Sequence, residues 1–191
     1  MKQAIVKAFE ESVSTKKAFL KQNLDTLIAA IDAIAQAFLN GNKLLIFGNG
    51  GSAADAQHIA AEFVNRFRMD RPPLPALALT TDTSAITSIA NDFDYKEIFS
   101  KQIKALGKEG DIALAISTSG NAANVLAAID VCKNLKIAVI GLTGGDGGKM
   151  ARKCDFLLCA TEGKNTARIQ ETHILVGHVI CEMVDVRLFA A

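Results

Sequence analysis

The chain has 191 residues, half of them hydrophobic, and its 21 basic and 20 acidic residues leave a net charge of +1. This length and composition predict one ordered domain, residues 1–191, that buries a core of its own. Near-neutral charge without a block of Lys or Arg argues against a nucleic-acid partner held through phosphate contacts. No apolar run approaches the ~20 residues that cross a bilayer, and no signal-peptide core follows the N-terminus. We therefore expect a cytoplasmic protein without a membrane partner.

The first forty residues are predicted to be helical. Residues 2–40 contain no Pro or Gly, and apolar side chains recur at helical spacing up to Phe38, before Gly41. Ser14 or Thr15 divides this segment in one interpretation, which gives two helices. A helix this long has more apolar surface than one sheet face needs. Segment 1–40 is therefore expected in an oligomer interface, and packing on its own domain is the alternative.

Short apolar strands alternate with helices through the rest of the chain. The strands are expected at residues 44–47, 76–79, 112–116, 137–142 and 156–159. The helices are expected at 52–66, 83–90, 95–106, 122–135 and 166–188. Strands that are apolar throughout and alternate with helices predict an α/β fold, in which a five-stranded parallel sheet is covered on both faces. Ligands of such folds bind beyond the carboxyl ends of the strands, so the loops that follow the strands are the informative ones.

A glycine turn followed by a helix extends from Gly48 to Arg66. Three glycines leave backbone N–H groups uncovered, and Ser52 is expected to cap the helix. The turn is neither a Walker A loop nor a G-x-G-x-x-G motif, so a nucleotide is a weak hypothesis. Strand, turn and helix N-terminus together predict a site for an anion or a polar ligand, and a tight turn without a ligand is the alternative.

Three consecutive hydroxyls follow the predicted strand 112–116. Ser117, Thr118 and Ser119 stand directly before a helix N-terminus and can hold a phosphate monoester without Lys or Arg. Helix capping is the alternative interpretation, although it needs only one of these hydroxyls. No pair of metal-binding carboxylates lies beside them in the sequence, so a sugar phosphate is a more natural ligand than a nucleotide.

All three histidines fall in predicted helices. His58 and Glu62 are four residues apart and share a helix face, which suits a shared metal or an acid–base pair, although a packing or surface pair is the alternative. The last helix carries Gln170, His173 and His178. The two histidines of this helix lie about 140° apart around its axis, so we do not expect both to face one site. Periodicity leaves open which of them does.

Five motifs together resemble the bacterial phosphoheptose isomerases, the sedoheptulose-7-phosphate isomerases of the sugar isomerase (SIS) fold. They are G-N-G-G-S-A-A-D-A-Q-H-x-A-A-E, N-R-F with R-P-P-L-P-A-L-A-L-T-T-D, I-A-N-D, S-T-S-G-N and A-R-I-Q-E-T-H-I-L-x-x-H. The resemblance covers nearly the whole chain. It implies a three-layer αβα sandwich and a homotetramer that converts sedoheptulose 7-phosphate to D-glycero-D-manno-heptose 7-phosphate. This reaction is the first step of heptose precursor synthesis for lipopolysaccharide and other bacterial glycans.

The resemblance also implies roles for individual residues. The family's zinc ligands match His58, Glu62, Gln170 and His178, which implies one zinc ion per subunit and selects His178 over His173. Glu62 is the candidate catalytic base and His178 the candidate acid. Substrate contacts would come from Asn49, Gly50, Gly51, Ser52, Glu62, Asn91, Asp92, Ser117, Thr118, Ser119 and Gln170. A carboxylate bound tightly to a metal is a poor base, so the sequence leaves open whether Glu62 changes role or the metal mainly organises the site.

Two further points bear on this interpretation. Many relatives have serine where this chain has Ala122, and the missing hydroxyl should weaken phosphate binding by about 1 kcal/mol. The alternative function is that of the DnaA initiator-associating proteins, which share the fold and act as tetrameric scaffolds without isomerase activity. Those proteins differ in the glycine turn, the hydroxyl loop and the last histidine. Because Gly51, Ser119 and His178 keep the isomerase pattern, the sequence favours the enzyme.

Overall fold

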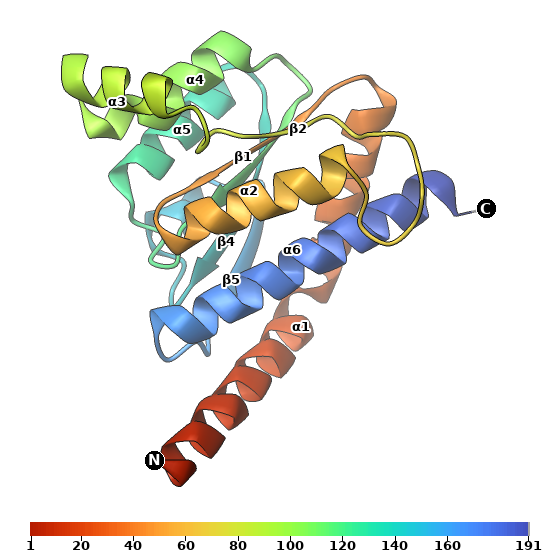
Figure 1. The fold of residues 1–191 in the computed structure, drawn as a ribbon, viewed down its shortest axis with the longest axis vertical. Coiled ribbons are helices and arrows are strands. Elements are labelled where there is room, and N and C mark those ends of the chain that lie inside the picture. Colours follow the sequence, from red (N-terminus) through yellow and green to blue (C-terminus); the bar gives the residue numbers. More distant parts are fainter. Residues whose placement is uncertain (191) are drawn as a thin grey trace.

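A five-stranded parallel sheet forms the centre of the molecule (Figure 1). The computed structural model describes residues 1–190. The strands are β1 (Leu44–Gly48), β2 (Ala76–Ala78), β3 (Ile112–Ile116), β4 (Ala138–Gly144) and β5 (Phe156–Ala160), in the spatial order β2-β1-β3-β4-β5. All neighbouring strands are parallel. The chain reverses its direction of winding between β1 and β3, so the loops that follow these two strands open at the switch point where such sheets bind ligands.

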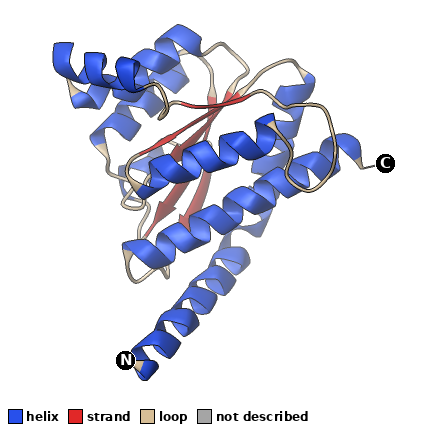
Figure 2. Cartoon of the chain, viewed as in Figure 1, coloured by secondary structure: helices blue, strands red, loops and turns tan. Residues whose placement is uncertain are grey.

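Helices cover both faces of the sheet (Figure 2). One face carries α1 (Lys2–Leu39), α2 (Gly51–Val64) and α6 (Thr166–Phe189), and the other carries α3 (Thr83–Asp92), α4 (Ile98–Leu106) and α5 (Ala123–Asn134). Two short 3₁₀ turns, Tyr95–Glu97 and Gly148–Arg152, complete the fold. Strand side chains alternate between two cores: Ile46 and Leu114 face α1, α2 and α6, whereas Phe47 and Ala115 face α4 and α5. The predicted αβα sandwich is therefore confirmed.

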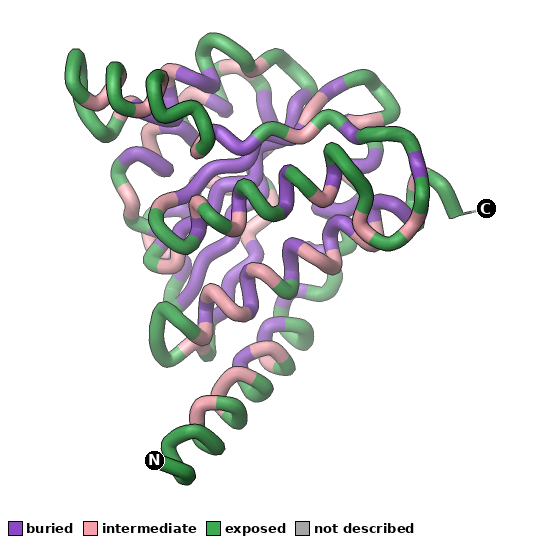
Figure 3. The backbone as a smooth tube through the Cα atoms, in the orientation of Figure 1, coloured by how far each residue is buried: buried purple, intermediate pink, exposed green. Residues whose placement is uncertain are grey.

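The N-terminal segment forms one continuous helix, so the predicted break at Ser14 or Thr15 is wrong. The Thr15 hydroxyl donates to the carbonyl of Glu11 at 2.8 Å, which satisfies it inside the helix. The first half of α1 projects beyond the body of the molecule and is largely exposed (Figure 3). The large apolar side chains that are exposed along the whole of α1 are Ile5, Val6, Phe9, Val13, Leu20, Leu24, Ile28 and Leu39. None of the helices in residues 1–190 is long and apolar enough to cross a membrane.

The start of α2 differs from the prediction, and α4 begins at Ile98, three residues after its predicted start, because a 3₁₀ turn precedes it. The bounds of the other elements agree to within about two residues. Gly50, with φ of +56°, is the N-cap, and no side chain caps the helix. Ser52 lies one residue inside the helix and is buried under the turn, where a Cβ atom on Gly48 would lie 2.8 Å from the Ser52 Cβ. The prediction that Ser52 caps this helix is therefore wrong, because its side chain packs against the end of β1.

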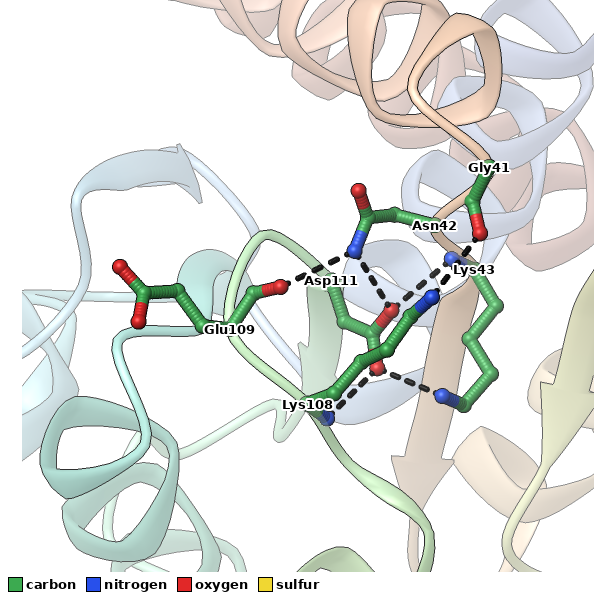
Figure 4. Close-up of polar contacts among 6 residues, drawn as sticks. All are labelled: Gly41, Asn42, Lys43, Lys108, Glu109 and Asp111. Carbon is green, nitrogen blue, oxygen red and sulfur yellow. Dashed lines mark hydrogen bonds and ion pairs between the residues drawn. The ribbon is translucent and has the colours of Figure 1, made fainter.

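A buried carboxylate joins the starts of β1 and β3, at the edge of the sheet opposite the loops that follow these strands (Figure 4). Asp111 is fully buried and accepts hydrogen bonds from Lys43 Nζ at 2.7 Å and from the Lys43 backbone at 3.0 Å. The Lys108 backbone (2.9 Å) and Asn42 Nδ2 (3.3 Å) also donate to it. Burial by itself raises the pKa of this carboxyl, but the hydrogen bonds outweigh burial, and the pKa lies below its ordinary value.

Asp111→Asn should lower the free energy of unfolding by about 2–3 kcal/mol at neutral pH, because it leaves buried donors without their charged acceptor. A lowered folded-state pKa stabilises the fold above the unfolded-state pKa, and this stabilisation is lost as the pH falls through the folded-state value. The difference between wild type and variant should therefore shrink in acid. Urea unfolding of both proteins, from neutral pH down to acid pH, measures this difference in the free energy of unfolding.

Glu109→Gln is the control, because its ion pair with Lys136 is exposed and should contribute under about 1 kcal/mol. Equal stability losses in both variants would contradict the role of Asp111.

Candidate active site

Two helices on the same face of the sheet bring two histidines together. His58 on α2 and His178 on α6 approach to 3.0 Å between their Nε2 atoms, with ring centroids 5.0 Å apart. Glu62 lies one turn after His58 on α2, and its Oε1 is 3.2 Å from His58 Nε2. The side chains of His58 and Glu62 are 48% and 24% exposed, so the cluster opens to solvent. These three residues, all predicted for the site, therefore lie together, although His178 is 120 residues from His58 in the sequence.

A glycine allows α2 and α6 to approach this closely. A Cβ atom on Gly177 would lie 2.6 Å from Ile59 Cδ1. Gly177 directly precedes His178, and Ile59 directly follows His58. The helices therefore pack closely beside the histidines, where any larger side chain at position 177 would push them apart.

Gln170 extends this cluster toward the glycine turn. It lies in the second turn of α6, and a Cβ atom on Gly51 would come within 2.6 Å of Gln170 Nε2. The side-chain amide therefore rests directly on the first residue of α2. Gly51 starts α2, which carries His58, and Gln170 lies on α6, which carries His178. The glycine turn and the two histidines are therefore connected through the packing of α2 against α6.

Asn49, in the glycine turn, is held by two residues that the sequence analysis missed. Asn49 and Asn124 exchange two side-chain hydrogen bonds of 2.8 Å, and the Tyr95 hydroxyl donates to Asn49 Oδ1 at 3.3 Å. Asn124 Oδ1 also accepts from the Val125 backbone, in the first turn of α5. Tyr95 is the single tyrosine of the chain and follows the I-A-N-D motif closely, which was the available signal.

The hydroxyl loop follows β3, but its three hydroxyls are not equally accessible. Ser117 is buried, Thr118 is half-buried and Ser119 is exposed. The Ser119 hydroxyl oxygen accepts from the Asn121 backbone at 3.2 Å. Ala122 is the N-cap of α5 and supplies no capping side chain. The hydroxyls of Thr118 and Ser119 are thus at least partly open to solvent, beside the N-terminus of α5, which the Ala122 side chain does not cap.

Asn91 and Asp92 lie at the end of α3, and both are exposed. Asn91 Nδ2 donates to Asp92 Oδ1 at 2.9 Å. Within residues 1–190 no hydrogen bond joins either side chain to α2 or α6. The structure does not bring these two residues into the histidine cluster, and their role as substrate contacts stays a prediction.

His173 belongs to the core rather than to the site. It is fully buried, and its Nε2 lies 3.0 Å from the Thr143 carbonyl oxygen on β4. Burial lowers the pKa of this imidazole to about 4, although the hydrogen bond with Thr143 opposes the shift. His173 is therefore neutral at physiological pH and ties α6 to the sheet. His178, which the resemblance selected, is the histidine that lies beside His58, and its role in catalysis and metal binding stays a prediction.

Asp55 is a further residue beside the cluster that the sequence analysis missed. It lies three residues before His58 on α2, so the two share a helix face. Burial raises the pKa of this carboxyl, and the charges of His58 and His178 oppose the shift. Asp55 Oδ2 is buried without a hydrogen-bond partner, so it adds an acidic group next to the two imidazoles.

Comparison with known proteins identifies first the class and then the family. A family model described as "SIS domain" matches residues 8–144, so the chain belongs to the SIS-domain proteins. The phosphoheptose isomerase of Thermodesulfovibrio yellowstonii is 52% identical over 185 residues, which span 97% of this chain and 92% of that protein.

Solved structures of phosphoheptose isomerases agree with this match. GmhA from Neisseria gonorrhoeae has a TM-score of 0.90 at 44% identity, over 96% of this chain and 98% of that one. The enzyme from Francisella tularensis has a TM-score of 0.92 at 39% identity, over 96% and 97% of the two chains. This chain belongs to the phosphoheptose isomerase family and is an isomerase, as the resemblance implied.

Proposed function

We propose that this isomerase interconverts sedoheptulose 7-phosphate and D-glycero-D-manno-heptose 7-phosphate, and that its product feeds heptose synthesis for lipopolysaccharide or related bacterial glycans. The observation that carries the proposal is the meeting of His58, Glu62 and His178, with Gln170 at the glycine turn. A carboxylate and an imidazole in one open site are the base and the acid that proton transfer between neighbouring carbons requires.

The proposed chemistry moves one proton along the sugar. A base removes a proton from C1 of the ketose, which gives an enediolate, and a proton returns at C2 while the oxygens exchange theirs. Glu62 is the proposed base, because its carboxylate is partly exposed in the site. His178 is the proposed acid, since its Nε2 faces the same opening and can hold or deliver a proton to a substrate oxygen.

We infer that one zinc ion per subunit would be held by His58, Glu62, Gln170 and His178. Two imidazoles, a carboxylate and an amide oxygen suit zinc, and the donor separations of 3.0 and 3.2 Å approach the ~3.3 Å between ligands that tetrahedral bonds of ~2.0–2.1 Å require. In residues 1–190, however, no three His, Cys, Asp or Glu side chains form a metal-binding group. Side-chain rotation would therefore have to accompany binding. Zinc would polarise the substrate carbonyl and stabilise the enediolate.

Incubation of the purified chain with sedoheptulose 7-phosphate, with and without a chelator, tests both proposals. NMR should detect the aldose phosphate, and elemental analysis should find zinc that the chelator removes. No product under any metal condition would favour the scaffold alternative. Full activity in protein shown to be free of metal would contradict the zinc proposal alone.

We propose that the phosphate binds at the Ser117–Ser119 loop and that the glycine turn holds the sugar end. Ser119→Ala should raise KM about 5–10-fold and leave kcat nearly unchanged, because it removes a hydrogen bond of about 1 kcal/mol to a phosphate remote from the reacting carbons. Steady-state kinetics measure both constants.

Thr161→Ala is the control for this substitution, because it removes an exposed hydroxyl in the loop after β5 and should change neither constant. A loss confined to kcat in Ser119→Ala would argue against a phosphate at this loop.

We propose further that the chain assembles as a homotetramer through α1. The support is the row of exposed apolar side chains along this helix, which a single subunit leaves uncovered. Size-exclusion chromatography with light scattering should give the mass of four subunits. The expected cytoplasmic location stays a prediction.

A further inference from the structure

The segment that follows α2 lies along α6 and contacts it at three positions. Residues 178, 182 and 185 of α6 are spaced by four and three, so they share one face of the helix. The His178 ring stacks on the Phe67 ring, with the ring centroids 5.4 Å apart. Glu182 forms an ion pair of 2.5 Å with Arg68, and Asp185 forms an ion pair of 2.9 Å with Arg71.

The third contact is the buried one. The side chains of Arg71 and Asp185 are 1% and 3% exposed, and Arg71 Nε donates to Asp185 Oδ1 at 2.9 Å. The rest of the guanidinium lies at the carboxyl end of α2. Its Nη2 donates to the Glu62 carbonyl at 2.9 Å, and its Nη1 donates to the carbonyls of Phe63 and Asn65 at 2.6 and 3.0 Å. Arg71 thus places a cation where the last turn of a helix carries unpaired carbonyls and partial negative charge.

We propose that Arg71 is a positioning residue that holds the carboxyl end of α2 against α6 and so sets the distance from His58 and Glu62 to His178. The residue whose carbonyl accepts from Arg71 is Glu62, and the carboxylate of this same residue lies against His58. Gly177 allows the helices to approach, and the Arg71–Asp185 pair holds them at that approach. No atom of Arg71 needs to touch the substrate for this role.

The kinetic readout rests on the proposed isomerase function. Because removal of Arg71 also leaves Asp185 as an unpaired buried charge, it should reduce stability as well. Arg68 provides the matched control, because it belongs to the same segment and pairs with the same helix. The side chains of Arg68 and Glu182 are 71% and 35% exposed, so solvent screens their ion pair.

The experiment compares Arg71→Gln, Arg71→Lys and Arg68→Gln with wild type by steady-state kinetics, after circular dichroism shows that each is folded. Arg71→Gln should lower kcat about 100-fold and change KM less than about 2-fold, because a displacement of catalytic groups by about 1 Å costs this much. Arg71→Lys should recover part of the loss, since an ammonium still pairs with Asp185. Arg68→Gln should match wild type.

Asp185→Asn keeps a hydrogen-bond acceptor for Arg71, and it tests the proposal if Arg71→Gln does not fold. It should lower kcat about 10-fold by weakening the same contact, and the double variant should lose no more than Arg71→Gln alone. A folded Arg71→Gln or Asp185→Asn with wild-type kcat, or an equal loss in Arg68→Gln, would overturn the proposal.

If the wild-type protein is inactive, the proposed function is wrong. Crystal structures of the wild type and of Arg71→Gln would then decide whether Arg71 has the positioning role. A longer His58–His178 separation in the variant would support the role, and an unchanged separation would refute it.

Discussion

Glu62→Gln and His178→Gln should each lower kcat by about 10²–10⁴-fold, which is the usual loss when a general base or acid is removed. Glu62→Gln preserves the shape of the side chain, His178→Gln replaces the ring with a polar side chain of similar size, and Glu62 is partly exposed, so the fold should remain intact. KM should change little by comparison, because the proposed phosphate contacts lie in the separate loop after β3. Proton exchange from C1 of the ketose into deuterated water, followed by NMR, separates the two roles.

Glu182→Gln provides the control on the same helix, since it removes a carboxylate one turn after His178 whose ion pair with Arg68 is largely exposed. Its kcat should stay within about 2-fold of wild type, as expected for the loss of a screened pair. Near-normal turnover in both Glu62→Gln and His178→Gln would show that the acid and the base have been assigned to the wrong residues.

Gly120→Ala should lower the free energy of unfolding by about 3–5 kcal/mol and raise KM more than about 10-fold. Gly120 has a φ of +63°, and its Cβ atom would lie 2.0 Å from the carbonyl oxygen of Gly147. Two backbone segments meet there, because Met150 N–H donates to the Gly120 carbonyl at 3.1 Å. The loop can accept a side chain only by moving away from the turn that supports it, and Ser119 would move with it.

Gly145→Ala is the control that has backbone strain without the steric clash that Gly120→Ala makes with Gly147. Gly145 has a similar φ of +61°, but nothing lies within 4 Å of the Cβ position. This variant should therefore lose only about 1–2 kcal/mol, the cost of a left-handed residue with a side chain, and should keep its KM. Urea unfolding and steady-state kinetics on both variants test this, and equal losses would mean that the contact with Gly147 has no part in holding the loop.

The architecture followed from local features of the sequence. Apolar runs such as 112–116, each followed by a segment of helical periodicity, can bury themselves only in a parallel sheet covered on both faces. For the same reason the position of the candidate ligand-binding loops was predictable, since parallel strands place their carboxyl ends at one edge of the sheet. The pairing of His58 with Glu62 was also predictable, because a spacing of four residues is a local property of a helix.

Local pattern failed where the outcome depended on contacts across the fold. The N-cap of α2 is Gly50 rather than Ser52, because the serine packs under the turn against the end of β1. The break near Ser14 is absent, since α1 satisfies the Thr15 hydroxyl internally. Asn124 and Tyr95 reach Asn49 from distant segments. The position of Tyr95 close after the I-A-N-D motif was a signal for Tyr95 alone, and spacing along the sequence does not predict either contact.

The sequence by itself determined the sheet and the loops that follow its strands, and through family resemblance it predicted the residues of the candidate site. Only the tertiary structure decided how the two halves of that site meet. His58 and His178 approach because Gly177 lets Ile59 pack against the backbone of α6 and because Arg71 joins the end of α2 to Asp185. His173 points instead into the core, toward β4. The distance between two helices depends on how their side chains pack and pair, and periodicity along one helix carries no information about it.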